Sequence, residues 1–180
     1  MSKIEESLRN APIIKKGDYK YVVHPITDGI PCIKPSLLEE VVDNIKDGMP
    51  KCDKIVTMEA MGIPIAAALS LKTGIPFTII RKRSYGLPGE VSVRQVTGYS
   101  SSNLFINGIG KGEDIVIVDD VISTGGTLSA VVSALKKMDV NIKKIFIAIN
   151  KGNIKEVERN IGMSINTIVD IEVNDKVKIK

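Results

Sequence analysis

The residues from Ile115 to Thr127 constrain the fold of this chain more than any other stretch. They read IVIVDDVISTGGT and begin with an unbroken β-branched run, which is typical of a strand buried on both faces. Two aspartates end this run, and a loop of hydroxyls and glycines follows. The order of strand, loop and helix indicates an α/β unit, because apolar residues recur at helical spacing beyond the loop. These residues are Leu128, Val131, Val132, Leu135 and Met138.

The loop from 123 to 127 has the composition of a phosphate-binding cradle. Its glycines let backbone N–H groups approach a ligand, and the N-terminus of the following helix favours an anion. Its hydroxyls add hydrogen-bond donors. It lacks the Gly-Lys-Ser/Thr ending of a Walker A loop, so that kind of nucleotide site is excluded. The candidate phosphate ligands are Ser123, Thr124, Gly125, Gly126 and Thr127.

Asp119 and Asp120 come before this loop, separated from it by Val121 and Ile122. Carboxylates accept hydrogen bonds from vicinal hydroxyls and can hold hydrated Mg²⁺. A sugar attached to the bound phosphate would lie beside them. The alternative is a buried strand whose acids only cap a turn, but it does not explain why acids, hydroxyls and glycines all meet at one strand end.

Residues 116–127 resemble the phosphoribosyl-diphosphate (PRPP) signature of type I phosphoribosyltransferases. The form Val118-Asp119-Asp120 followed by Thr124-Gly125-Gly126-Thr127 is most similar to adenine phosphoribosyltransferases. The resemblance is firm over residues 54–135 and weak at both ends. It implies a central, mostly parallel sheet flanked by helices, with a small hood. It also implies transfer of a phosphoribosyl group from PRPP to a purine base, with Mg²⁺, by a homodimer.

Composition favours one globular domain spanning residues 1–180, since hydrophobic residues are 43% and charged residues 26% of the chain. The net charge of +4 is mild and the lysines are scattered, so a nucleic-acid partner is not indicated. Cys32 and Cys52 have no metal-type spacing and read as reduced thiols of a cytoplasmic protein. No apolar run approaches the roughly 20 residues that span a membrane.

Residues 1–35 are the least regular part of the sequence. Ile4 and Leu8 allow a short helix, and residues 19–23 allow an edge strand. The resemblance implies that this segment and part of the C-terminus form the hood over the base. His24, the only histidine, is either a surface or partly buried residue or a base contact from the hood.

Other periodic stretches predict the remaining elements of the sheet and its helices. Ser36 and Glu39 have the spacing of a capping box at the start of a helix. We expect helices at 36–48, 63–72 and 154–160, strands at 55–58, 77–80 and 142–150, and a final strand at 164–173. The segment 53–80 is therefore a predicted βαβ unit.

The turn Glu59-Ala60-Met61-Gly62 follows a predicted strand, at the end where open α/β sheets bind ligands. It resembles the loop that receives pyrophosphate in this family. Adenine enzymes commonly carry arginine where this chain has Met61, so backbone N–H groups would have to bind the anion. An ordinary βα turn is the alternative.

Arg81, Lys82 and Arg83 come directly after the next predicted strand. Three cations near a pyrophosphate site would neutralise the anion, whereas a solvated rim is the alternative. If the strand continues, Arg81 and Arg83 share one side of it.

Residues 82–103 have little helical signal and are flanked by glycines, as in a mobile lid. Residues 87–91 resemble the start of the flexible catalytic loop of adenine phosphoribosyltransferases, and a lid would shield a reactive ribosyl cation from water. Glu90 matches the family glutamate near the base and is our candidate catalytic acid or base; a solvated loop acid is the alternative. Tyr99, with Ser100 beside it, resembles a lid tyrosine.

The choice of purine base is the least determined property. The better-known six-oxopurine enzymes have aspartate at the position of Ser123, so Glu90 would replace it as proton carrier. Met61, the Arg-Lys-Arg-Ser-Tyr sequence at 81–85 and the Ile/Lys-rich composition resemble an archaeal subfamily that uses hypoxanthine and guanine. We expect those bases, with adenine as the alternative. A PRPP-sensing transcription regulator is a remote alternative, because residues 1–35 are too short and proline-broken for a winged helix.

Overall fold

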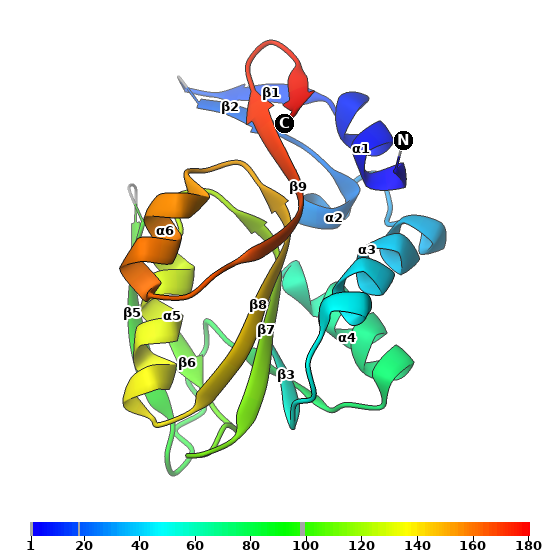
Figure 1. Cartoon of the computed structure of the whole chain (residues 1–180). Helices are drawn as coiled ribbons and strands as arrows, with labels where there is room; N and C mark the ends of the chain where they lie inside the picture. The colour runs from blue at the N-terminus through cyan, green and yellow to red at the C-terminus, as the bar shows by residue number, and fades with distance from the viewer. Residues whose placement is uncertain (1, 18, 98–99) are drawn as a thin grey trace.

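The structure, a computed structural model, describes residues 2–17, 19–97 and 100–180. Its centre is a six-stranded sheet in the order β10-β9-β8-β7-β3-β4 (Figure 1). The strands from β9 to β4 are parallel, and β10 is antiparallel to β9. The expected mostly parallel sheet is confirmed. Its strands are β3 (Lys54–Met58), β4 (Phe77–Ile80), β7 (Asp114–Ile122), β8 (Asn141–Asn150), β9 (Asn166–Val173) and β10 (Val177–Ile179).

Helices cover both faces of this sheet. In Figure 1, α3 and α4 lie on one side of the strands, and α5 and α6 lie on the other. Within the part of the chain that the structure describes, no helix is long and apolar enough to cross a membrane. The helices are α1 (Lys3–Arg9), α2 (Pro25–Asp28), α3 (Pro35–Gly48), α4 (Gly62–Thr73), α5 (Gly126–Lys137) and α6 (Ile154–Ile161).

The β-branched run at the start of β7 is buried on both faces, as predicted. Val116 and Val118 belong to the apolar cluster that includes α3 and α4, whereas Ile115 and Ile117 belong to the cluster that includes α5 and α6. This division follows from the alternation of side chains along a strand. All four side chains are 0% exposed. β7 therefore joins the two halves of the core.

The predicted βαβ unit is confirmed as β3, α4 and β4, and Gly74 ends α4 with a φ of +72°. The capping box predicted at Ser36 is wrong. α3 begins after Lys34, with Pro35 in its first turn and no side-chain cap. Proline needs no N–H partner at this position and fixes a helical φ, so it replaces the cap.

The N-terminal segment forms α1 as expected and then an antiparallel hairpin of β1 (Ile13–Lys16) and β2 (Tyr19–Val22). β2 thus pairs with β1 and does not form an edge of the main sheet. The hairpin, α1 and β10 lie together at one end of the molecule (Figure 1). Lys20 of this hairpin pairs with Asp175, at 2.8 Å, in the turn before β10. β10 was not expected, because residues 164–173 were predicted to hold the final strand.

A second hairpin occupies much of the segment predicted as a lid. β5 (Val91–Thr97) pairs antiparallel with β6 (Ser100–Ile106). Val93, Leu104 and Ile106 are buried in the cluster that contains α5, and their neighbours Arg94 and Asn103 are exposed. The alternation is that of a half-buried strand. The sequence analysis did not anticipate this hairpin.

His24 is 1% exposed, and so is more deeply buried than the surface or partly buried position expected for it. Its Nδ1 accepts the Ile26 N–H at the start of α2 (3.2 Å), and its Nε2 lies 2.7 Å from Ser7 Oγ. Burial lowers the pKa of His24 to about 4, although the nearby Asp28 carboxylate acts in the opposite direction. The imidazole is therefore neutral at pH 7 and joins α1 to α2.

Candidate functional site

The predicted order of strand, loop and helix is confirmed at β7 and α5. β7 continues to Ile122, past the two aspartates that were expected to end it, and α5 begins at Gly126. Gly125 precedes the helix with a φ of +72°, a conformation that favours glycine. A Cβ on Gly125 would lie 2.4 Å from Val157 of α6. The loop is thus drawn tightly against α6, at the N-terminus of α5, where backbone N–H groups favour an anion.

Asp119 and Asp120 lie side by side before this loop. Asp120 is 8% exposed and Asp119 is half-buried. Burial raises the pKa of Asp120, and burial together with the charge of Asp120 raises the pKa of Asp119. Two such carboxylates repel one another until a cation or hydroxyl donors reach them. Their arrangement suits vicinal hydroxyls or hydrated Mg²⁺.

The turn at 59–62 lies directly against these aspartates. The Glu59–Ala60 peptide bond is cis, and α4 begins at Gly62. A Cβ on Gly62 would lie 2.1 Å from Thr57 Oγ1 and 2.5 Å from Asp119 Oδ1. Met61 extends toward the N-terminal segment, where its Cε would lie 3.7 Å from a Cβ on Gly29. The structure therefore brings the turn and Asp119 together, as a shared ligand site would require.

The basic segment at 81–83 is joined to the same turn. The Glu59 carboxylate accepts hydrogen bonds from Arg81 Nε (2.9 Å) and from the Lys82 backbone N–H (3.0 Å). These donors lower the pKa of Glu59. Arg83 lies with its guanidinium 5.8 Å from the centre of the Tyr85 ring. The cations of residues 81–83 were predicted to neutralise a bound anion, and Glu59 already neutralises part of their charge.

Glu90 has a fully engaged carboxylate. It accepts hydrogen bonds from Ser84 Oγ (2.5 Å), Asn107 Nδ2 (2.7 Å) and the backbone N–H groups of Tyr85 (2.9 Å) and Gly86 (3.3 Å). These bonds, that of Ser84 first, lower the pKa of Glu90 to about 2. In this arrangement Glu90 is an ionised carboxylate that orders its own loop.

The predicted lid residues are only partly described. Tyr99 lies outside the described residues. Ser100 begins β6, and its side chain also lies outside the described part. Their predicted role as lid residues stays a prediction.

Sequence reasoning missed the loop after β8, which packs on the cradle. A Cβ on Gly152 would lie 1.8 Å from the Ser123 carbonyl oxygen, and the Lys151 N–H donates to the Ile122 carbonyl (2.9 Å). The Lys151 ammonium lies 5.6 Å and 5.1 Å from the ring centres of Tyr19 and Tyr21. The predicted strand at 142–150 could have indicated this loop, because a strand that pairs in parallel with β7 must end at the same edge of the sheet.

These contacts border a cavity of about 410 Å³ between the cradle and the N-terminal hairpin. Ser123 and Lys151 contribute its sheet side, and Tyr19 contributes its hairpin side. The other polar lining residues are Lys20, Glu172, Asn174 and Lys180. A purine ring has the size and shape for such a space.

Comparison with known proteins agrees with this geometry. A family model described as the phosphoribosyl transferase domain matches residues 36–178. A hypoxanthine/guanine phosphoribosyltransferase of Methanocaldococcus infernus is 56% identical over 182 residues, covering 99% of this chain and 100% of the relative. The protein of the same name from Methanothermus fervidus is 52% identical over 183 residues, covering 99% and 97%. This chain belongs to the phosphoribosyltransferase family.

Solved phosphoribosyltransferases share the fold. The adenine phosphoribosyltransferase of Thermoanaerobacter pseudethanolicus aligns with a TM-score of 0.78 at 20% identity, covering 93% of this chain and 99% of that one. The Saccharomyces cerevisiae adenine enzyme aligns with a TM-score of 0.74 at 21% identity, covering 91% and 97%. At this sequence identity, the structural likeness shows that this chain has the same fold, but it does not show which purine base this chain uses.

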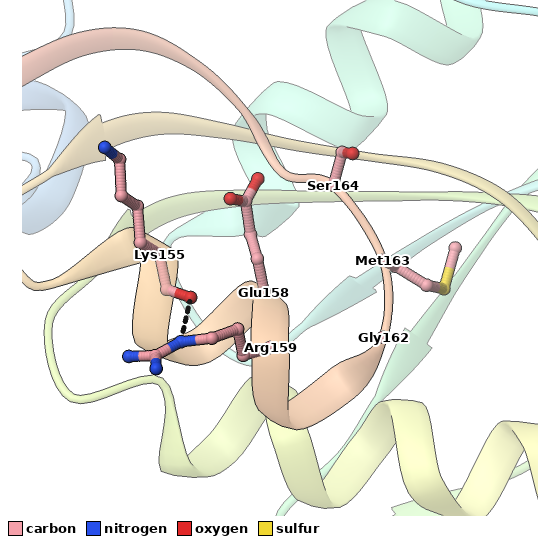
Figure 2. Close-up of a pocket in the computed structure, with 6 residues that line it drawn as sticks. All are labelled: Lys155, Glu158, Arg159, Gly162, Met163 and Ser164. Carbon is pink, nitrogen blue, oxygen red and sulfur yellow. Dashed lines mark hydrogen bonds between the residues drawn. The ribbon is translucent and has the colours of Figure 1, made fainter.

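A different hollow lies on the outer side of α6, away from the cradle. Figure 2 shows its lining, with Lys155 and Arg159 extending from the helix. Arg159 Nε donates to the Lys155 carbonyl (3.3 Å), and Glu158 accepts the Ile165 N–H (2.7 Å). Lys155 and Arg159 are exposed. This hollow has neither a glycine loop nor a pair of acids and carries none of the predicted chemistry.

Substituting Gly62 tests the contact between the turn and Asp119. We expect Gly62→Ala to weaken PRPP binding about tenfold or more, because the new Cβ must displace Thr57 and Asp119, or the start of α4. Gly110→Ala is the matched control, since its Cβ would lie 3.9 Å from the nearest atom, in Glu113. Isothermal titration calorimetry with PRPP and Mg²⁺ measures both. Equal affinity of the two variants would contradict the assignment.

Proposed function

We propose that this phosphoribosyltransferase acts in purine salvage and transfers the 5-phosphoribosyl group of PRPP to hypoxanthine and guanine. The products are IMP or GMP and pyrophosphate. The observation that carries the proposal is the meeting of the acidic end of β7, its glycine loop and the 59–62 turn at one edge of the sheet. The relatives named hypoxanthine/guanine phosphoribosyltransferase, which match nearly the whole chain, support the choice of base.

PRPP has three parts, and each has a matching surface. The 5-phosphate would bind the backbone N–H groups and hydroxyls of residues 123–127. The ribose hydroxyls would donate to Asp119 and Asp120. The pyrophosphate would lie on the 59–62 turn, with cations from residues 81–83 beside it. Holding sugar and base in line supplies much of the rate enhancement.

The acidic pair also fits Mg²⁺. Among the described residues no group of three or more metal-binding side chains is present, so a cage made entirely of protein ligands is not indicated. Mg²⁺ usually keeps several waters and binds one or two carboxylates together with substrate phosphates. Asp119 and Asp120 provide that number of carboxylates. When bound, the metal would help to neutralise the departing pyrophosphate.

The chain's own residues stabilise the charge that develops as the bond to pyrophosphate breaks. Positive charge builds on the ribose in an oxocarbenium-like state, comparable to glycoside cleavage. The carboxylates of Asp119 and Asp120 lie where they would stabilise that charge, and Arg81 and Lys82 would stabilise the leaving anion. A lid formed by residues 82–103 would exclude water. Residues 1–35 and part of the C-terminus would form the hood over the base.

Lys151 supports a six-oxopurine over adenine. Its ammonium offers only hydrogen-bond donors, which suit the 6-oxo group of hypoxanthine and guanine. The 6-amino group of adenine presents a donor at the same place. A donor facing a donor leaves both unpaired, and such mismatches discriminate strongly between substrates. Lys151 borders the cavity beside the cradle, where a base joined to the ribose would lie.

Two further properties belong to this proposal. A homodimer fits the composition of α4, which is apolar on nearly all sides although Leu71 is 90% exposed. A helix of this kind is normally buried, so a second copy of the chain would cover it. A cytoplasmic location fits the two free cysteines, Cys32 and Cys52.

A base-competition assay tests the proposed reaction. Purified protein receives PRPP, Mg²⁺ and a mixture of adenine, hypoxanthine, guanine and xanthine, and mass spectrometry identifies the nucleotides. We expect IMP and GMP without AMP. AMP alone would contradict the base assignment, and PRPP binding without any nucleotide would favour a regulatory sensor. Lys151→Met should lower kcat/KM for hypoxanthine about 10- to 100-fold. Lys155→Met, on the exposed side of α6, is the control.

Glu90 remains our candidate for proton transfer at the base. We expect Glu90→Gln to lower kcat about 100-fold or more at saturating substrate, the usual scale of acid–base catalysis. Because Glu90 also orders its loop, Ser84→Ala serves as a control that removes one of its hydrogen bonds but keeps the carboxylate. Turnover of Glu90→Gln within a few-fold of the wild type would show that Glu90 is not the proton carrier.

Leu71 tests the dimer. We expect the wild type to sediment as a dimer and Leu71→Glu as a monomer, because the charge cannot be buried at an apolar interface. Leu87→Glu, at another exposed leucine, controls for the added charge. A wild-type protein that sediments as a monomer at every concentration would contradict the proposal.

A further inference from the structure

Thr57 presents an unusual hydroxyl at the edge of the site. Its side chain is 0% exposed, and Thr57 Oγ1 is the single buried oxygen or nitrogen without a hydrogen-bond partner among the side chains that the structure describes, which exclude those of residues 1, 16, 18 and 95–102. Buried polar groups are nearly always paired, because an unpaired one loses its bonds to water and gains nothing in return. Such an exception calls for a physical explanation.

The position of this hydroxyl suggests its use. Thr57 is the second-last residue of β3, whose carboxyl end lies beside that of β7. A single point, the Cβ position of Gly62, lies 2.1 Å from Thr57 Oγ1 and 2.5 Å from Asp119 Oδ1. The two oxygens therefore face the same small volume above Gly62, where no side chain intervenes. Thr57 and Asp119 come from different strands, and the missing Cβ of Gly62 lets them approach.

We propose that the Thr57 hydroxyl positions the Asp119 carboxylate for the ribose of PRPP. This inference rests on the proposed function. When ribose hydroxyls donate to Oδ2 of Asp119, Thr57 Oγ1 donates its proton to Oδ1, the oxygen that faces the same volume above Gly62. The bond fixes the rotation of the carboxylate and satisfies the hydroxyl. Thr57 is thus a positioning residue that acts through Asp119 and does not contact the reacting atoms.

The geometry separates this role from ordinary packing. A residue that only fills space at this position is replaced equally well by valine, which has the same shape but no hydroxyl. A residue that positions Asp119 is replaced well by serine, which keeps the hydroxyl and loses a methyl group. The two substitutions therefore have opposite consequences under the two explanations.

The experiment compares Thr57→Val and Thr57→Ser with the wild type by titration calorimetry. The first ligand is PRPP with Mg²⁺, and the second is inorganic pyrophosphate with Mg²⁺, which has no ribose. We expect Thr57→Val to weaken PRPP binding about tenfold and to leave pyrophosphate binding within twofold of the wild type. Thr57→Ser should bind PRPP within threefold of the wild type. The melting temperature of ligand-free Thr57→Val should equal or exceed that of the wild type, because an unpaired buried hydroxyl has been removed.

Thr78→Val on the neighbouring strand β4 is the matched control, since its hydroxyl lies 3.4 Å from the Asn107 carbonyl and away from Asp119. Equal PRPP affinity of Thr57→Val and wild type would overturn the inference. So would an equal loss for PRPP and pyrophosphate, or a melting temperature several degrees lower, since both indicate general damage. A wild-type protein that binds no PRPP would instead refute the proposed function, and this inference with it.

Discussion

The parallel pairing of β3 with β7 is the constraint on which the rest of the site depends. Ile55 lies opposite Val116 and Val56 opposite Ile117, so both strands run to the same edge of the sheet. This pairing alone is enough to make the turn after β3 and the aspartates of β7 neighbours. β8 pairs with β7 on the other side and brings Lys151 to the same edge. Three loops that are distant in sequence meet because three buried strands run in register.

At this edge of the sheet, burial disfavours the negative charges of the two aspartates. The apolar strands that position the loops also remove water from Asp119 and Asp120, which raises the pKa values of both carboxyl groups. Glu59, in the turn at the same edge, already has a cationic partner in Arg81. The acidic pair is therefore the part of the edge where a bound cation or hydroxyl donors would relieve the most electrostatic free energy. The folded state tolerates the unfavourable burial of these two carboxyl groups, because the neighbouring apolar strands supply ample stability.

Much of this arrangement could be predicted from sequence, for a physical reason. The β-branched run of β7, its acids and its glycine loop are local signals, and each is satisfied within its own element. Non-local features escaped prediction. The role of Lys151 depends on which strand pairs with β7. One local prediction also failed, since α3 begins at Pro35 without a side-chain cap where the spacing suggested a capping box at Ser36. β5 and β6 read as a polar loop, because few of their described side chains face the core: Val93, Leu104 and Ile106 are buried there, and Val91 packs against them.

The glycines of the site explain how a shared fold can serve different bases. Gly62, Gly125 and Gly152 stand where any Cβ would collide with a neighbouring element. The surface proposed for phosphate and ribose is therefore shaped largely by backbone, which changes little as side chains diverge. The cavity between the cradle and the N-terminal hairpin is lined by side chains, Tyr19 and Lys151 among them. Substitutions there can alter the choice of base without disturbing the sheet. This accounts for a fold shared at 20% identity with an adenine enzyme.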